Sequence, residues 1–374
     1  MEDKLITIAV HNYARAEIIR TKLEAEGVEC YLKNINLIHS VISGGVKVRV
    51  HQRNLEKALR IVERISEQFR DEHLEDQDIS SSSVQRILVP IDFSDYSVNA
   101  CKYAIGLAEK LNAEIKLMHV YYNPVVNSMP LTDTYYYQVN MDEVIREIEI
   151  RAKENMDEFY MDLKEKIEKD NIEGVKIDFS LVRGIASEEI IAKSQEYKPD
   201  VIIIGIRGKG ERENDLIGSV AAKIIEDTQV PVLVIPEDSL YQGIGTINVL
   251  YATNFDDSDY NAIKKLMNVL SPFEKRLYCV HIGTEDTNIW DKVKMDSLKE
   301  KLRKEYKDYE IECSLMETQD FFKGVQDIIR EKKIDILSLV THKRNLISKL
   351  LNPSTTRKVL FHTNIPFLVF HTDK

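Results

Sequence analysis

Hydrophobic and polar residues follow one another in segments whose period changes along the chain, and this pattern predicts three parts. Residues 1–70 hold an apolar run, a helical period, two alternating stretches and a second helical period. Gly27 stands where the first of these helices should stop. The order predicts a small βαββα domain at the start of the chain.

An acidic stretch that ends in consecutive serines follows this segment. It has no hydrophobic period and little apolar surface to bury, which is typical of a linker. We therefore predict a linker over residues 71–83 and a new domain from Val84 onward.

From Val84 to residue 238 strand-like and helix-like segments alternate, which predicts an α/β domain with crossover helices. The strand-like runs are almost continuously apolar, as expected of parallel strands that are covered on both faces. The expected strands cover residues 85–91, 114–120, 175–182, 200–205 and 230–236. The expected helices cover residues 97–112, 141–169, 186–197 and 218–228.

The same order of segments returns over residues 245–374. Asp92 aligns with Asn254 in one matching stretch, and Gly205 aligns with Val340 in another. The difference in residue number between aligned positions is smaller in the second stretch than in the first. We attribute this to the tyrosine-rich insertion that the first copy carries at 121–140 and the second copy lacks. We interpret this as an internal duplication. The predicted fold class is α/β, with two tandem Rossmann-like domains of five parallel strands in the order 3-2-1-4-5.

Composition narrows the classes of function. The net charge is −11, from 51 Lys and Arg against 62 Asp and Glu, which argues against a nucleic-acid partner. Apolar runs are too short to span a membrane, so we expect a cytoplasmic protein without a membrane partner. The 4 cysteines are far apart in sequence, and we interpret them as buried thiols in a reducing compartment.

Candidate chemistry gathers at the expected carboxyl ends of the first and fourth strands of the first copy, where ligands bind in sheets of this order. Gly205 and Gly208 leave room for a ligand and a sharp turn. Gly218 and Ser219 open a helix, whose N-terminus favours an anion. The side chains of Arg207 and Lys209 add positive charge. An ordinary surface loop with glycines at its turns is the alternative.

The spacing Gly-2x-Gly-9x-Gly-Ser from Gly205 to Ser219 resembles the nucleotide-binding motif of the ATP-binding universal stress proteins, and the sequence PIDFS ahead of it resembles their opening motif. The resemblance covers residues 84–238. It implies an ATP cofactor bound with Mg²⁺, and it assigns no residue of the chain as a metal ligand. The residues that the resemblance brings to the nucleotide are Pro90, Ile91, Asp92, Val120, Gly205, Arg207, Gly208, Lys209, Gly218, Ser219 and Val220.

Individual roles also follow from this resemblance. Asp92 should face the ribose hydroxyls or a metal-bound water, although it could instead only cap the next helix. The backbone of Val120 should read the adenine edge, and Pro90 and Ile91 should line the base pocket. In this family the fifth strands pair across a dimer, so we expect the two copies to form an intrachain pseudo-dimer. The sequence leaves open whether the chain also forms a homodimer.

The second copy departs from the motif at several positions. Val340, Lys343 and Pro353 replace the three glycines, and Asn254 replaces Asp92. Side chains at these positions would fill the space for phosphates, and a proline has no N–H to donate. We therefore expect the second copy to have lost the ability to bind ATP. Binding of another anion by this copy is the alternative.

The first 70 residues resemble a short prokaryotic family of signal-transducing domains with a ferredoxin-like layout, through the helix that ends at Gly27 and the strand that follows it. A regulatory or interaction domain is expected, and an oligomerisation domain is the alternative. For the whole chain we expect a nucleotide-sensing signalling or stress-response protein that acts on an unidentified protein partner. A slow ATPase or adenylating enzyme and a non-binding tandem scaffold are the alternatives.

Overall fold

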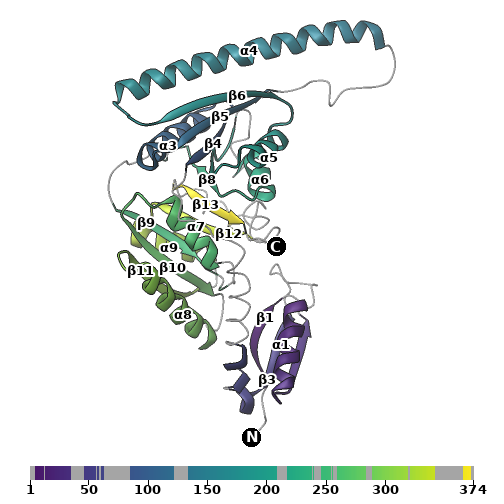
Figure 1. The fold of residues 1–374 in the computed structure, drawn as a ribbon, viewed down its shortest axis with the longest axis vertical. Coiled ribbons are helices and arrows are strands. Elements are labelled where there is room, and N and C mark those ends of the chain that lie inside the picture. The colour runs from purple at the N-terminus through teal and green to yellow at the C-terminus, as the bar shows by residue number, and fades with distance from the viewer. Residues whose placement is uncertain are drawn as a thin grey trace. The chain divides into compact units, whose positions relative to one another are not determined.

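A computed structural model of the chain (Figure 1) describes most of its residues and divides it into two compact units, Met1–Ser81 and Ser82–Lys374. The described residues are 5–11, 13–34, 46–55, 57–58, 60–62, 85–121, 134–208, 217–237, 239, 246–253, 255, 259–283, 289–318, 321–341 and 365–371. The predicted linker at 71–83 lies outside them.

The first unit contains an antiparallel sheet in the order β1-β3-β2. Its elements are β1 (Leu5–His11), α1 (Tyr13–Ala25), β2 (Cys30–Asn34), β3 (Val46–His51) and a short 3-10 helix (Gln52–Asn54). Gly27, beyond the end of α1, has a φ of 77°, which a residue without a Cβ adopts at little cost. Ala16, Ile19 and Leu23 recur at helical spacing and are buried in the core of this unit.

The first repeat of the second unit has five parallel strands in the order β6-β5-β4-β7-β8. The strands are β4 (Arg86–Ile91), β5 (Glu114–Tyr121), β6 (Lys176–Arg183), β7 (Val201–Gly205) and β8 (Val232–Ile235). The helices are α3 (Asp95–Leu111), α4 (Thr134–Lys169), α5 (Ala186–Tyr197) and α6 (Ser219–Asp227). The predicted α/β fold dominated by parallel strands is confirmed.

Helix α4 begins at Thr134, inside the stretch that the sequence assigned to an insertion, whereas the helical period had indicated a start at residue 141. No glycine or proline stands between Thr134 and Asn140, so nothing there interrupts the helix.

The second repeat has the same order of elements as the first. Its strands are β9 (Ile247–Ala252), β10 (Lys275–Gly283), β11 (Glu310–Glu317), β12 (Ile336–Thr341) and β13 (Phe367–His371). Its described helices are α7 (Asp259–Val269), α8 (Ile289–Glu305) and α9 (Phe321–Lys332). The strands run in the order β11-β10-β9-β12-β13.

The two repeats share one ten-stranded sheet because β13 pairs antiparallel with β8. Phe367 lies opposite Val234, Leu368 opposite Leu233, and Val369 opposite Val232. Figure 1 shows these two strands side by side at the centre of the sheet.

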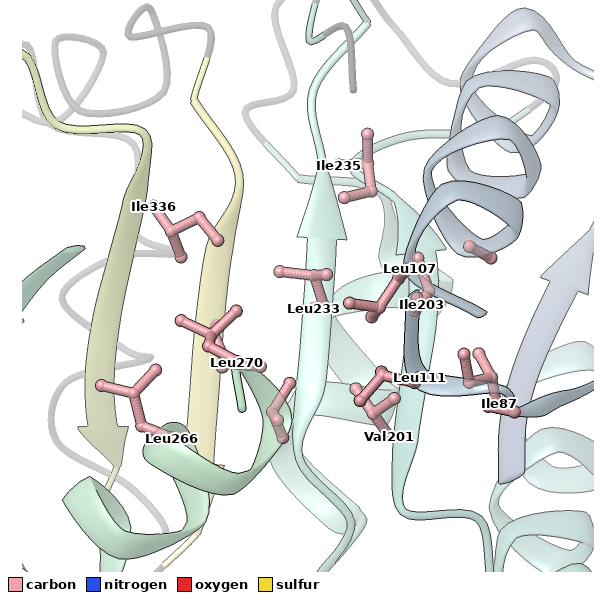
Figure 2. Packing of buried hydrophobic residues seen from close by; sticks show 14 of the residues in the cluster. Ile87, Leu107, Leu111, Val201, Ile203, Leu233, Ile235, Leu266, Leu270 and Ile336 are labelled. Atoms are coloured by element: carbon pink, nitrogen blue, oxygen red, sulfur yellow. The ribbon is translucent and has the colours of Figure 1, made fainter. Parts of the chain in front are cut away.

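The hydrophobic core is continuous across this junction. Figure 2 shows Leu233 and Ile203 of the first repeat on the same packed layer as residues of the second repeat. Leu266 and Ile336 belong to the same cluster, which covers one face of the sheet. A second cluster, which includes Leu88, Ile202 and Val234, covers the other face. Burial on both faces explains why the strands read as continuous apolar runs.

Candidate functional site

The candidate site lies in the first repeat, at the carboxyl ends of β4 and β7. The order β5-β4-β7 reverses direction at this pair, and crevices form at such points in parallel sheets. The loop after β4 carries Asp92, and the residues after β7 carry Arg207 and Gly208. The predicted site residues therefore come together from both sides, apart from Lys209, which lies outside the described residues.

The ladder between β4 and β7 stops early. Its register pairs are Ile87 with Val201 and Leu88 with Ile202. Ile202 donates its N–H to the carbonyl of Pro231, on the β8 side, so Ile203 directs its backbone groups toward β4. The carbonyl of Ile203 would meet the N–H of residue 90, and Pro90 has none. The hydrogen-bonded pairing of β4 with β7 therefore ends before the carboxyl ends of the two strands.

Asp92 and Ser94 form a compact turn at the start of α3. The Oδ1 atom of Asp92 accepts hydrogen bonds from the Ser94 N–H, at 3.0 Å, and from the Ser94 hydroxyl, at 2.5 Å. Ser94 is itself the N-cap of α3 and accepts from the Ser97 N–H at 3.3 Å. Helix capping thus falls to Ser94, and Asp92 holds the capping residue in place.

Gly208 lies against the other carboxylate oxygen of Asp92. A Cβ built on Gly208 would come within 2.5 Å of Asp92 Oδ2, closer than real Cβ contacts. The sharp turn expected at Gly208 does not use a positive φ, which among the described glycines only Gly27 and Gly174 have. The residue is glycine because the chain approaches a carboxylate, not because the backbone is left-handed.

Gly205 has a different role from the one its place in the motif suggested. A Cβ at Gly205 would lie 2.8 Å from backbone atoms of Tyr96 in α3. The missing side chain therefore lets α3 pack closely on the end of β7. Gly205 therefore does not itself provide room for a ligand.

Helix α6 starts at the crevice. Gly218 is its N-cap, with φ −65° and ψ 151°, and donates its N–H to the carbonyl of Ile206 at 2.8 Å. Gly218 has no side chain to cap the helix, and exposed Ser219 and partly buried Val220 follow it. The partial positive charge of this helix end is directed toward the crevice.

Arg207 stacks its guanidinium over the ring of Tyr96, 5.4 Å from the ring centroid. Both side chains are partly buried, and Tyr96 belongs to the first turn of α3. The contact fixes a positive charge between α3 and the loop that leads to α6.

His119 belongs to the site and was not among the residues expected there. Its Nδ1 lies 2.8 Å from the Ile91 carbonyl, which can only accept, so Nδ1 carries the proton. Its ring packs on Phe93, with centroids 4.4 Å apart. Burial lowers the pKa of His119, while the Ile91 carbonyl and the charge of Asp92 act in the opposite direction. The recurrence of a histidine at the end of the second strand in both copies was the available signal.

Val120 follows His119 at the end of β5. The pairs between β4 and β5 end at Ile91 with His119, while β5 continues alongside β6, with Val120 opposite Val182. The backbone of Val120 thus lies beyond the last β4 pair, at the rim of the crevice. Pro90 and Ile91 are buried in β4 just below it.

The second repeat keeps part of this geometry. Phe93 and Phe255 both have positive φ, 62° and 57°. The Nδ1 atom of His281 lies 2.8 Å from the carbonyl of Thr253, and its ring is 4.4 Å from that of Phe255. The replacements Asn254, Lys343 and Pro353 lie outside the described residues.

The equivalent strands of the second repeat are paired further toward their carboxyl ends. The β9–β12 ladder has two further pairs, Tyr251 with Ser338 and Ala252 with Leu339, because Ala252 has the N–H that Pro90 lacks. Asp259 lies at the start of α7, where its buried carboxylate accepts from the hydroxyls of Thr253, at 2.5 Å, and Tyr251, at 2.8 Å. This end of the second repeat is therefore packed as core.

The described part of the chain lacks two further kinds of feature. No group of three or more His, Cys, Asp or Glu side chains there could hold a metal ion. No helix among the described residues is both long and apolar enough to cross a membrane.

Comparisons with known proteins agree on one family. A family model described as the universal stress protein family matches residues 83–236. Universal stress protein MJ0531 of Methanocaldococcus jannaschii is 31% identical over 40% of this chain and 81% of its own length. Universal stress protein Slr1230 of Synechocystis is 24% identical over 77% of this chain and 100% of its own length.

A solved structure extends this similarity to both repeats. The universal stress protein from Archaeoglobus fulgidus is 20% identical, with a TM-score of 0.55 over 77% of this chain and 97% of its own. At this identity the match concerns the fold alone.

Proposed function

The chain belongs to the universal stress protein family, in a tandem form, and we propose that its first repeat binds ATP at the carboxyl ends of β4 and β7. The observation that carries the proposal is the meeting of three features at one strand end: Gly208 lies against the Asp92 carboxylate, Arg207 stacks on Tyr96, and Gly218 at the start of α6 donates its N–H to Ile206. Ligands of parallel sheets bind at such a strand end, where the order of the strands reverses.

The residues present fit the parts of the nucleotide. The start of α6, at Gly218 and Ser219, would receive the phosphates, with Arg207 and Lys209 adding positive charge. Asp92 would accept from the ribose hydroxyls through the carboxylate that Ser94 holds in place. The backbone of Val120 and the end of β4 would meet the base. Mg²⁺ would be held mainly by the phosphates.

One nucleotide per chain follows from the contrast between the repeats. The second repeat extends its ladder to Ala252 and has a buried network of Asp259, Thr253 and Tyr251 beside this strand end. It also has side chains at all three glycine positions. We propose that it binds no ATP.

The role that fits this site is nucleotide sensing within a stress response. Asp92 holds Ser94 through Oδ1 and would meet the ribose, and His119 uses Nδ1 on a backbone carbonyl, so neither is placed as a base for an attacking nucleophile. Turnover should accordingly be slow, since phosphoryl transfer needs a positioned nucleophile. The N-terminal unit, with its β1-β3-β2 sheet, is proposed as a ferredoxin-like module that communicates with a partner protein.

Calorimetric titration of the purified full chain with ATP tests the proposal, with GTP as the control for the base. We expect one ATP per chain, weaker binding of GTP, and hydrolysis far slower than nucleotide exchange. Two ATP molecules per chain would contradict the assignment to the first repeat. Absence of binding would contradict the function itself.

A further inference from the structure

Two cysteines that are far apart in sequence are direct neighbours in the sheet of the second repeat. Cys279 in β10 and Cys313 in β11 are register partners on adjacent parallel strands. Adjacent strands lie about 4.8 Å apart. This spacing falls inside the Cα separation of roughly 4.4–6.8 Å that a disulfide bridges.

The two thiols differ in environment. Cys279 is fully buried, whereas Cys313 is partly exposed. The neighbouring Cys313 side chain raises the pKa of Cys279, and the neighbouring Cys279 side chain lowers the pKa of Cys313. Burial acts against ionisation at both sulfurs.

Charged groups around the pair add to this difference. Lys299 and Arg303 of α8 favour the Cys313 thiolate, and Glu312 opposes it; the carboxylate of Asp259 disfavours charge on Cys279. An attacking thiolate and a protonated partner are the two species that a disulfide-forming pair needs.

A cavity of about 500 Å³ lies at the start of the same two strands. Its lining includes Leu277 and Ile311, each two residues before a cysteine and therefore on the same face of the sheet. Arg303 also lines it, and its charge acts on Cys313. A small neutral oxidant can thus approach the face of the sheet that carries the pair.

We propose that Cys279 and Cys313 form a reversible oxidation site, in which hydrogen peroxide oxidises Cys313 and Cys279 then closes a disulfide. The Cys313 thiolate attacks one peroxide oxygen, the O–O bond breaks, and the leaving hydroxide takes up a proton to become water. The sulfur of Cys279 then attacks the sulfenic sulfur of Cys313. Its thiol proton leaves with the sulfenic hydroxyl as a second water. Both thiols are oxidised and one peroxide is reduced.

The bond would be strained and therefore easily reduced. Parallel neighbours keep their Cβ atoms about one strand spacing apart, farther than the roughly 3.5–4.5 Å of relaxed disulfides. Strand β11 pairs with β10 alone in the described sheet, so it can shift toward its neighbour. Strained disulfides are labile, which suits a reversible modification.

The other two cysteines provide internal controls. Cys101 is fully buried in α3, and burial raises its pKa far above the usual range. Burial also raises the pKa of Cys30, to about 11. Neither has a cysteine as register partner on the described strands, so both should stay reduced under conditions that oxidise the pair.

The test uses the full chain, treated with equimolar hydrogen peroxide and then alkylated under denaturing conditions. Peptide mass spectrometry without reduction should show Cys279 linked to Cys313, with Cys30 and Cys101 alkylated, and dithiothreitol should remove the link. A sulfinic acid on Cys313 with Cys279 still alkylated would overturn the proposal. A disulfide-linked dimer, or random pairing of all four cysteines, would do so as well.

Two variants separate the roles. Cys279→Ser should trap the sulfenic acid on Cys313, which a cyclic 1,3-diketone labels, and Cys313→Ser should abolish both label and cross-link. Cys101→Ser is the matched control and should leave the cross-link unchanged. Equal labelling of the Cys313→Ser variant would contradict the assignment of the attacking sulfur. The peptide mapping of the wild-type chain needs no substitution, so the proposal can be tested even if a variant misfolds.

Discussion

The two repeats have the same strand order, yet they differ where β4 and β9 end. Both have a phenylalanine of positive φ after the strand, and both have a histidine whose Nδ1 meets a backbone carbonyl at the strand end, that of Ile91 or Thr253. They differ at Pro90 and Ala252, and so in the length of the ladder that follows. Features common to both repeats therefore belong to the architecture. Features found in the first repeat alone are the ones to connect with a ligand.

This distinction changes how a motif is interpreted. The turn at Phe93 persists at Phe255, in a repeat whose motif is lost, so a strained backbone at this point is not a sign of nucleotide binding. Gly205 is likewise a glycine because Tyr96 of α3 packs directly against it. Pro90, which we expect to line the base pocket, also ends the β4–β7 ladder, because it has no N–H to donate.

We expect the largest effect on ATP affinity from a side chain at Gly218, the N-cap residue of α6 in the first repeat. Gly218→Val should reduce ATP affinity by more than about 100-fold, because its methyl groups would occupy the space in front of the α6 N–H groups. Gly218 has a φ of −65°, so valine is compatible with the backbone and the fold should persist. Calorimetry measures the affinity, and Ile185→Val, at the N-cap of α5, is the control. Full affinity in Gly218→Val would falsify the phosphate assignment.

A change of Asp92 to the residue of the second repeat separates charge from shape. Asp92→Ala should weaken binding by about 1–3 kcal/mol, the scale for hydrogen bonds to a charged group, or roughly 5- to 150-fold in Kd. Asp92→Asn keeps an acceptor for Ser94 and should cost less. Equal losses in the two variants, measured by calorimetry, would mean that the charge is what the nucleotide requires.

Exchanging the strand-end residues tests the ladder directly. Pro90→Ala restores an N–H opposite the Ile203 carbonyl, and we expect the ladder to extend and ATP affinity to fall several-fold. Ala252→Pro removes the equivalent bond and should lower stability by about 1–3 kcal/mol, the cost of a buried carbonyl left without its donor. Binding isotherms and urea unfolding measure the two effects. Unchanged ATP affinity in Pro90→Ala would show that the length of the β4–β7 ladder does not control binding.

The smallest effect concerns acid stability. The pKa of His119 is lower in the folded chain than the unfolded value of about 6.5. Below that pH the unfolded chain binds more protons, so the stability that His119 contributes is present above about pH 6.5 and is lost as the pH falls through the folded value. His119→Gln should flatten the fall in melting temperature between pH 7 and pH 5. His281→Gln is the matched control in the second repeat.

The sequence predicted the α/β elements well because buried parallel strands are continuous apolar runs. Helix α5, expected over 186–197, has those bounds. The alignment of the copies also placed Val340 opposite Gly205, and β12 extends through it. These inferences need only local period and order.

Relations between distant residues could not be obtained in this way. Cys279 and Cys313 meet because of the register of β10 on β11, and a single sequence gives no register. The role of Gly205 depends on where α3 crosses β7, and that of Pro90 on which neighbour its missing N–H would face. Spacing identified the residues of the candidate site but not what each one contacts.

The pairing of β8 with β13 has a consequence for how the chain behaves on dilution. An interface between separate subunits dissociates as concentration falls, whereas these strands are tethered, and a tether acts like a partner at roughly millimolar concentration. The apolar edge of β8 is therefore shielded from aggregation however little protein a cell contains.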